Sequence, residues 1–145
     1  MKPLLLLLFG LLPLAAQAGL GGSADSIATD RVQLHSASFK ATPLRDYTLN
    51  TLQLASGTRV REYLNAAGTV FGVSWNGPFP PDLEQLLGDS YTRYHGAAHA
   101  GPGRHPVTVH EQGLMLETSG HGRQFSGRAW LPDLLPTGVS GADIQ

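Results

Sequence analysis

The sequence contains no cysteine among its 145 residues. This absence excludes a disulfide framework, a thiolate metal site and a lipid-anchored N-terminus, which needs a cysteine to carry the lipid. An excess of charge of one sign is also lacking, because the sequence has 10 Lys and Arg residues and 11 Asp and Glu residues. So small a net charge offers no electrostatic footprint for nucleic acid or for an anionic membrane. The chain must therefore rest on an ordinary hydrophobic core.

Long apolar runs are missing as well. The run Leu4–Leu14 is shorter than the roughly 20 residues that a membrane-spanning helix needs. It ends at Ala16-Gln17-Ala18, a small-x-small triplet typical of signal peptidase sites. We predict that residues 1–18 are a cleaved secretory signal and that Gly19 begins a mature periplasmic or secreted protein, with an uncleaved membrane anchor as the alternative.

Complete catalytic motifs are also absent. Neither G-x-G-x-x-G nor P-loop spacing occurs. Leu87-Gly88-Asp89-Ser90 resembles the Gly-Asp-Ser block of one class of lipases and esterases, but their downstream Asp-x-x-His is missing. A small secreted hydrolase using Ser90, His95 or His121 is therefore an alternative in which nothing nearby orients the base. The sequence predicts no catalytic residues and leans away from an enzyme.

Two histidines four residues apart raise the question of a metal site. His95 and His99 would share one face of a helix and could both reach one ion. A structural or catalytic zinc site normally needs three or more ligands, however, and no glutamate stands between the two. We expect surface histidines near a helix C-terminus, where the helix dipole favours their cationic form. The prediction is no metal and no cofactor, with His95 and His99 as the candidates for a histidine-based metal binder.

Alternating apolar residues and turn signals dominate the chain from Asp46 onwards. They predict an α+β domain over residues 46–136, an antiparallel, hairpin-rich sheet of five or six strands with one main amphipathic helix on one face. Residues 19–45 are predicted to be a loosely structured leader, with a short helix possible near 26–35, and residues 137–145 a tail. The predicted strands are DYTLNTLQLA, TRVREYL, TVFGVSW, PVTVHEQ, LMLETSG and GRQFSGRAW.

The main helix is predicted over about residues 82–99. Pro81 suits the first helical position, and Asp82 is favourable in the first turn. An apolar stripe at helical spacing follows, although Gly88 weakens the middle. Gly101-Pro102-Gly103 ends the helix. The stripe consists of Leu83, Leu86, Leu87, Tyr91, Tyr94 and Ala98.

The segment Asn65-Ala66-Ala67-Gly68 is typical of a three-residue hairpin loop. Counting outward from it, Tyr63 faces Phe71, Arg61 faces Val73 and Arg59 faces Trp75, all on one side of the sheet. The Arg59 guanidinium would then lie on the Trp75 ring. Trp75 and Trp130 each end a strand and are predicted to be buried over the core. If either is exposed, a ligand or partner surface is the alternative. The candidate binding residues are Arg59, Arg61, Tyr63, Trp75 and Trp130.

Several blocks together resemble one family. They are Gly19-Leu20-Gly21-Gly22, Val60-Arg61-Glu62-Tyr63, Trp75-Asn76-Gly77-Pro78 and the segment GRAWLPDLLPTGVSGADI. The chain thereby resembles bacterial exported proteins grouped as domain of unknown function 2844. The resemblance implies a proteobacterial, exported and uncharacterised protein, and it supplies no catalytic residues.

The function that these observations favour is binding. An export signal, a self-sufficient core and no convergent set of acid, base, nucleophile or metal ligand indicate a non-catalytic accessory domain. It would act in the periplasm or outside the cell by binding an envelope protein or a ligand. No nucleic-acid partner and no stable membrane anchor after signal cleavage are expected.

Overall fold

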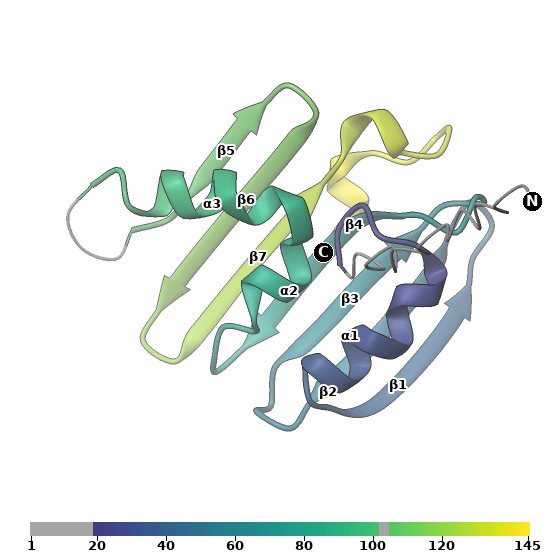
Figure 1. Ribbon diagram of the computed structural model, residues 1–145, viewed down its shortest axis with the longest axis horizontal. Helices are drawn as coiled ribbons and strands as arrows, with labels where there is room; N and C mark the ends of the chain where they lie inside the picture. The colour runs from purple at the N-terminus through teal and green to yellow at the C-terminus, as the bar shows by residue number, and fades with distance from the viewer. Residues whose placement is uncertain (1–18, 102–104) are drawn as a thin grey trace, which may run out of the picture.

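The protein is an α+β domain built on one antiparallel sheet (Figure 1). The computed structural model describes residues 19–101 and 105–145, so the predicted signal segment lies outside the described residues. The sheet has seven strands in the order β1-β2-β3-β4-β7-β6-β5. They are β1 (Ser36–Pro43), β2 (Thr48–Leu54), β3 (Arg59–Leu64), β4 (Val70–Gly77), β5 (Thr108–Glu111), β6 (Leu114–His121) and β7 (Gln124–Trp130).

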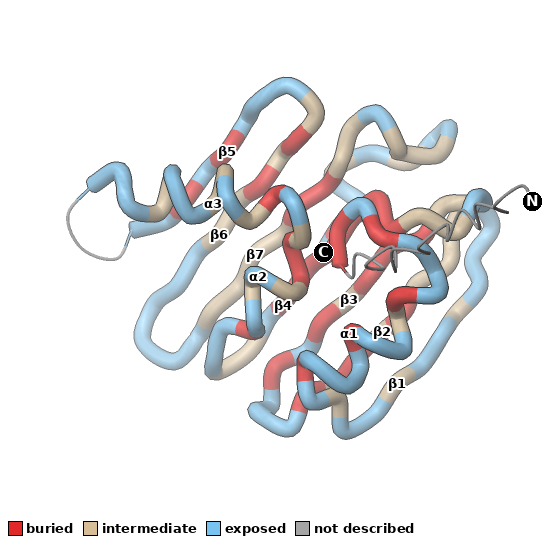
Figure 2. The backbone as a smooth tube through the Cα atoms, viewed as in Figure 1, coloured by how far each residue is buried: buried red, intermediate tan, exposed pale blue. Residues whose placement is uncertain are grey.

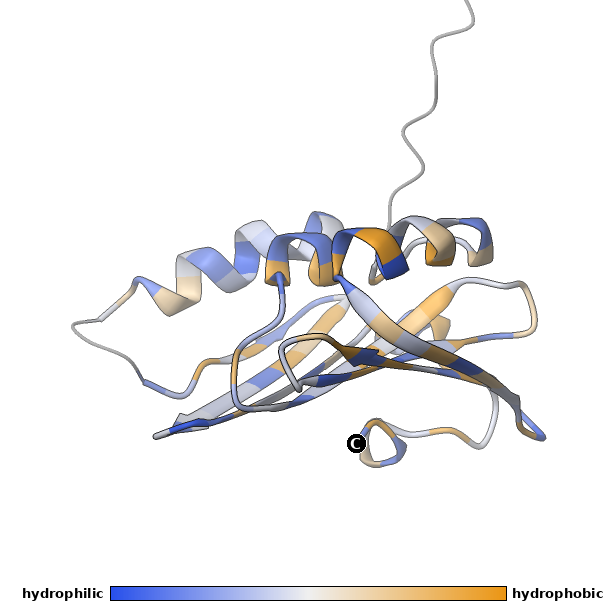
Figure 3. Cartoon of the chain, turned by 90° about the horizontal axis from the view of Figure 1, so that it is seen from below, coloured by the Kyte–Doolittle hydropathy of each residue, from blue (hydrophilic) through white to orange (hydrophobic). Residues whose placement is uncertain are grey.

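Helices cover one face of this sheet and the C-terminal segment covers the other (Figure 3). The helices are α1 (Ile27–Gln33), α2 (Leu83–Leu87) and α3 (Tyr91–Ala98), with short 3-10 turns η1 (Ala24–Ser26) and η2 (Gly88–Ser90) leading into α1 and α3. The turns η3 (Pro132–Leu134) and η4 (Gly141–Asp143) belong to the C-terminal segment. Two sheet faces covered by different elements produce two separate core clusters.

The seventh strand, β1, is the one that the predicted five or six strands lack. Its sequence, SASFKATP, has Phe39 as its only large apolar side chain, and most of the strand is exposed, as Figure 2 shows along the sheet edge. Such a strand lacks the apolar alternation by which strands are recognised. Residues 19–45 therefore differ from the predicted loose leader, because they contain η1, α1 and β1.

The β3–β4 hairpin corrects the predicted register. The predicted loop is present, and it is closed by the hydrogen bond from Asn65 N to Thr69 O of 3.0 Å. A β-bulge then intervenes: Leu64 pairs with Val70 but Tyr63 pairs with Gly72, which leaves Phe71 as an extra residue on β4.

Beyond the bulge, every β4 residue faces the opposite side from the one predicted. Trp75 pairs with Val60 rather than with Arg59, and both Trp75 and Val73 belong to the cluster under the helices. The predicted contact of Arg59 with Trp75 is therefore wrong. Tyr63 and Phe71 do share a face, with ring centroids 6.2 Å apart, because Phe71 lies inside the bulge.

The predicted helix over 82–99 is interrupted at Gly88. Asp82 caps α2 by accepting a hydrogen bond from Gln85 N at 3.1 Å, so Pro81 precedes the helix rather than beginning it. Gly88 has a φ of +53° and a ψ of −131°, a conformation outside the helical region that glycine readily adopts. The helical stripe thus splits into a buried part on α2 and a half-buried part on α3.

The C-terminal segment is a structural layer of the domain. Ile144 is fully buried with Tyr63, Phe71 and Trp130. The main-chain oxygen of Gln145 accepts hydrogen bonds from Arg61 Nη1 at 2.6 Å, Ser74 Oγ at 2.7 Å and Tyr63 Oη at 2.9 Å. Three donors on one oxygen hold this segment on the sheet.

Candidate functional site

A groove lies between α3, the β6–β7 hairpin and the corner after β4. Its volume is about 740 Å³, within the range of roughly 300–1,000 Å³ usual for small-molecule sites. The corner Pro78-Phe79-Pro80 forms one wall, and the Thr58 hydroxyl holds it by donating to the Phe79 carbonyl at 2.6 Å.

The floor of the groove is the indole of Trp75. A β-carbon on Gly127, the residue that pairs with Trp75 on β7, would collide with that ring. Glycine at 127 therefore lets the indole lie flat against the sheet, where only 4% of Trp75 is exposed. Four apolar side chains from different segments also line the groove: Leu83, Tyr94, Val107 and Phe125.

The polar groups of the groove are neutral or basic. No Asp or Glu belongs to its lining, as far as the described residues go. Arg123 is its cationic residue, and its guanidinium lies over the Phe79 ring, 5.5 Å from the centroid. His99 and His105 add titratable nitrogens. The groove thus offers an apolar surface whose lining includes a cationic side chain.

Phe79 is the most exposed aromatic wall, with 47% of its surface accessible. Exposed apolar residues beside a groove are typical of interaction sites. The sequence carries its signal in the motif Pro78-Phe79-Pro80-Pro81, where a rigid corner holds a large apolar residue outside any strand. Phe79, Phe125 and Arg123 were not among the predicted binding residues.

The five predicted binding residues do not form one site. Trp75 lies under the groove, whereas Tyr63 and Trp130 are buried beneath the C-terminal segment on the other face. Arg59 and Arg61 line a second, polar hollow of about 540 Å³ that also includes Arg123. The β-bulge reverses the faces on which the side chains at the end of β4 lie. Trp75 and the two arginines are therefore on opposite faces of the sheet.

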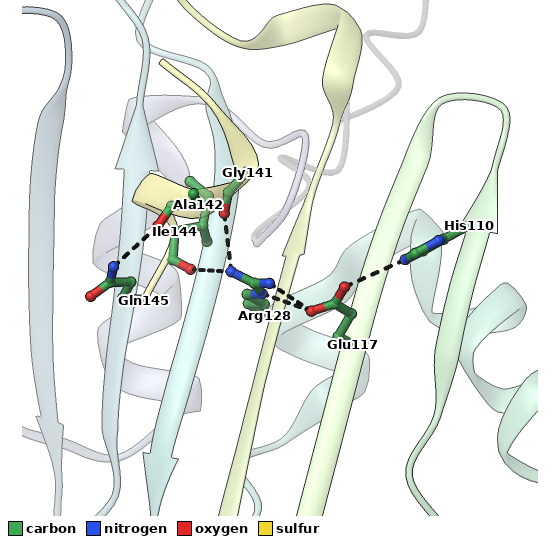
Figure 4. Close-up of polar contacts among 7 residues, drawn as sticks. All are labelled: His110, Glu117, Arg128, Gly141, Ala142, Ile144 and Gln145. Atoms are coloured by element: carbon green, nitrogen blue, oxygen red, sulfur yellow. Dashed lines mark hydrogen bonds and ion pairs between the residues drawn. The ribbon is translucent and has the colours of Figure 1, made fainter.

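The other face carries a row of polar side chains that ends on the C-terminal segment (Figure 4). Glu117 receives a hydrogen bond from Arg128 Nε at 2.9 Å and lies 3.4 Å from His110 Nε2. Arg128 also donates to the carbonyls of Gly141 and Ile144. The pKa of Glu117 is lowered, chiefly by its hydrogen bond from Arg128. This row fastens the segment to the sheet.

The histidine and serine candidates are not brought together in the groove. Ser90 is 4% exposed at the η2–α3 junction, and neither it, His95 nor His121 lines the groove. His95 and His99 stack at 4.1 Å between ring centroids. His99 Nδ1 lies 2.8 Å from the His95 carbonyl, a local contact within the helix. Across the described residues, no three His, Asp or Glu side chains gather closely enough to hold a metal ion.

Two carboxyl groups are fully buried between the helices and the sheet: Asp30 on α1 and Glu62 on β3. Asp30 accepts hydrogen bonds from Gln85 Nε2 at 2.7 Å and from the Gly19 backbone nitrogen at 3.0 Å. Neither oxygen of Glu62 has a partner at hydrogen-bond geometry among the described residues, although Asn50 is near enough to favour its charge slightly.

Burial and, to a lesser extent, the neighbouring Asp30 carboxyl raise the pKa of Glu62 to about 8. Burial also raises the pKa of Asp30, against the opposing hydrogen bonds from Gln85 and Gly19. An ionised carboxylate is costly in an apolar interior unless a cation accompanies it. This pair is the most unusual electrostatic feature of the described residues.

The fold and these sites define a class: an α+β domain with an open apolar groove and no assembled catalytic set among the described residues. The chain belongs to the family described as Protein of unknown function (DUF2844), whose model matches residues 16–144. This confirms the resemblance seen in the sequence. Comparison with curated proteins and with solved structures found no match. No helix in the described part of the chain is long and apolar enough to span a membrane.

Proposed function

We propose that the protein is an exported, non-catalytic accessory domain that acts by binding, and that the groove over Trp75 is its binding surface. The observation that carries this proposal is the apolar groove of about 740 Å³ with Phe79 exposed at its wall. Export is supported by the short apolar run and the Ala16-Gln17-Ala18 triplet at the start of the chain.

The chemistry of the groove indicates what it binds. Aromatic and aliphatic walls suit an apolar group, while Arg123 suits an acidic or hydrogen-bond-accepting end. An apolar segment of an envelope protein and a small amphipathic acid share this chemistry. The hydrolase and metal-binding alternatives lack an observation of comparable weight, since their residues are not gathered in one place.

A site-specific cross-linking experiment tests the proposal. A photoreactive phenylalanine analogue would replace Phe79 in one variant and Val32 in a control variant. Val32 lies on α1 and is 74% exposed, so it is apolar and accessible but outside the groove. Cells of the native host would be irradiated before the envelope is extracted.

The Phe79 variant should yield adducts that the Val32 variant does not. A protein adduct indicates an envelope partner, whereas a small mass increment on the Phe79 peptide indicates an amphipathic molecule. Loss of either adduct on Arg123→Gln would support the role of the cation. Equal labelling at Phe79 and Val32, or no labelling at either, would contradict a binding role for the groove.

A further inference from the structure

The residues that follow the predicted signal peptide are built into the fold. Leu20 N donates to Leu86 O at 2.9 Å, and Leu20 is 4% exposed. Gly21 and Gly22 exchange hydrogen bonds with Val70 at the start of β4, at 2.8 and 2.9 Å. These bonds join the segment to both α2 and the sheet, so that its position is fixed from its first residue.

Gly19 itself has no room for a side chain. A β-carbon there would collide with the carbonyl groups of Gln85 and Leu86, and its φ of +84° favours glycine in any case. Its backbone nitrogen points at Asp30 and lies 3.0 Å from Oδ2 in a buried contact. The nitrogen at which the predicted cleavage would occur is therefore already directed at a buried carboxyl group.

The charge balance around that nitrogen is incomplete. Asp30 and Glu62 are both fully buried. Besides each other, the side chains that influence their charges are the neutral amides of Gln85 on α2 and Asn50 on β2. While residue 18 is attached, Gly19 contributes one amide hydrogen and no charge. Two buried acids with only neutral donors are an unfavourable arrangement.

We propose that cleavage after Ala18 turns the Gly19 nitrogen into a buried α-ammonium group that forms an ion pair with Asp30 and thereby completes the core. In the cleavage, water adds across the Ala18–Gly19 peptide bond. The oxygen of the water remains on the Ala18 carboxylate, and the Gly19 amine takes up a proton. The new group carries a positive charge and three hydrogens, enough for Asp30 and for one further acceptor.

Two independent observations meet at this residue. The Ala16-Gln17-Ala18 triplet predicts the cut from sequence alone, and the structure directs the resulting nitrogen at Asp30. The inference rests on the export part of the proposed function but not on the groove. It assigns to signal removal a second consequence, namely a more stable mature domain than the precursor.

The reactivity of the amine tests the ion pair. The mature chain would contain two amines, the α-amine of Gly19 and the side chain of the exposed Lys40, the one lysine after residue 18. A free α-amine has a pKa of about 8 and lysine one of about 10, so an unpaired α-amine is acylated faster near neutral pH. Burial with Asp30 should reverse that order.

For the experiment, the full chain is expressed with export and the processed protein is purified. Its N-terminus is determined by intact mass. The protein is then pulsed with an acetylating reagent, natively and in concentrated urea, and the acetylation of Gly19 is measured against that of Lys40. We expect native acetylation of Gly19 to be at least tenfold slower than in urea, while Lys40 changes little.

A matched control moves the charge without changing a side chain. One extra glycine inserted between Ala18 and Gly19 leaves an amide at Gly19 and puts the amine one residue outside. The extended chain should show fast native acetylation and a melting temperature lower by about 5 °C or more, because the buried ion pair with Asp30 is lost.

Three outcomes would overturn the inference in different ways. A Gly19 amine that reacts natively as fast as in urea contradicts the ion pair but leaves export intact. Equal melting temperatures for the two processed chains contradict the completion of the core. An N-terminus other than Gly19 contradicts both the cut and the pair, while the cross-linking at Phe79 still decides the groove independently.

Discussion

The two faces of the sheet are covered in different ways, and the difference separates stability from binding. On one face, the C-terminal segment presses Ile144 into an aromatic cluster and is fastened by hydrogen bonds to Gln145 and from Arg128. On the other, three short helices leave a groove over Trp75 and enclose two carboxyl groups. The first face is covered by the C-terminal segment, whereas the second keeps an open groove and two buried carboxyl groups without a cationic partner among the described residues.

This contrast teaches that burial alone does not mark a site. Trp75 and Trp130 are both nearly buried, and each lies against a glycine, Gly127 and Gly141 respectively. Only the indole of Trp75 borders a groove, because nothing in the described chain covers the surface beside it. Function is therefore expected on the helix face.

The largest effect should come from Glu62 on the helix face. In the full-length chain, its folded pKa of about 8 lies above the ordinary value of 4.5. The folded state then holds more protons than the unfolded state between these pH values, so stability falls as pH rises through that window, by roughly 5 kcal/mol. Glu62→Gln should flatten the curve of unfolding free energy against pH, measured by urea titration. An unchanged slope would contradict the perturbed carboxyl.

On the opposite face, Ile144→Ala should cost about 3 kcal/mol of unfolding free energy, because it leaves a cavity in a closed cluster. Urea denaturation would measure this loss. Phe79→Ser in the groove should change stability by less than about 0.5 kcal/mol, as for other exposed positions. Similar losses for the two variants would remove the distinction between the faces.

Gly127→Ala should destabilise by about 2 kcal/mol, since its β-carbon would collide with the Trp75 ring and force the indole to shift. The ring should become more accessible, which a red shift of tryptophan emission and stronger acrylamide quenching would report. Gly96→Ala is the matched control: Gly96 lies in α3 with nothing within 4 Å of a new β-carbon, and alanine favours a helix.

The smallest effect belongs to Glu117. Its pKa is lowered by Arg128, so its contribution is present above its unfolded pKa and lost as pH falls through its folded pKa, the opposite sign to Glu62. Both side chains are about one-third exposed, which limits the pair to less than about 1 kcal/mol. Arg128→Gln should remove this acid dependence. In the unsubstituted protein, the contribution of the pair to stability should weaken with added salt. A larger, salt-insensitive loss would point instead to the hydrogen bonds on Gly141 and Ile144.

Much of the fold follows from local patterns. The turn Asn65–Gly68, the strands around it and the class of the domain are recognisable from alternation and turn residues. The β4 register is not, because six consecutive residues from Val70 to Trp75 are buried. A strand buried on both faces has no alternation of polar and apolar residues. Its sequence therefore does not reveal where a bulge reverses the faces of its side chains.

The candidate site was recovered only in part, through Trp75. Phe79 and Arg123 meet across 44 residues of chain, and no periodicity connects a proline corner with a distant hairpin. The carboxyl pair is equally hidden, since Glu62 sits in the middle of an otherwise ordinary strand. Both sites depend on which elements the sheet places side by side.

By itself, the sequence determined the α+β class, the family, the lack of thiol and disulfide chemistry and the hairpin turn, because each depends on composition or on neighbouring residues. Only the tertiary structure decided which face Trp75 occupies, that a groove remains beside it, and that the Gly19 nitrogen meets Asp30. These features arise from contacts between distant segments, whose free energies are set by burial and charge in the folded interior rather than by any local preference of the chain.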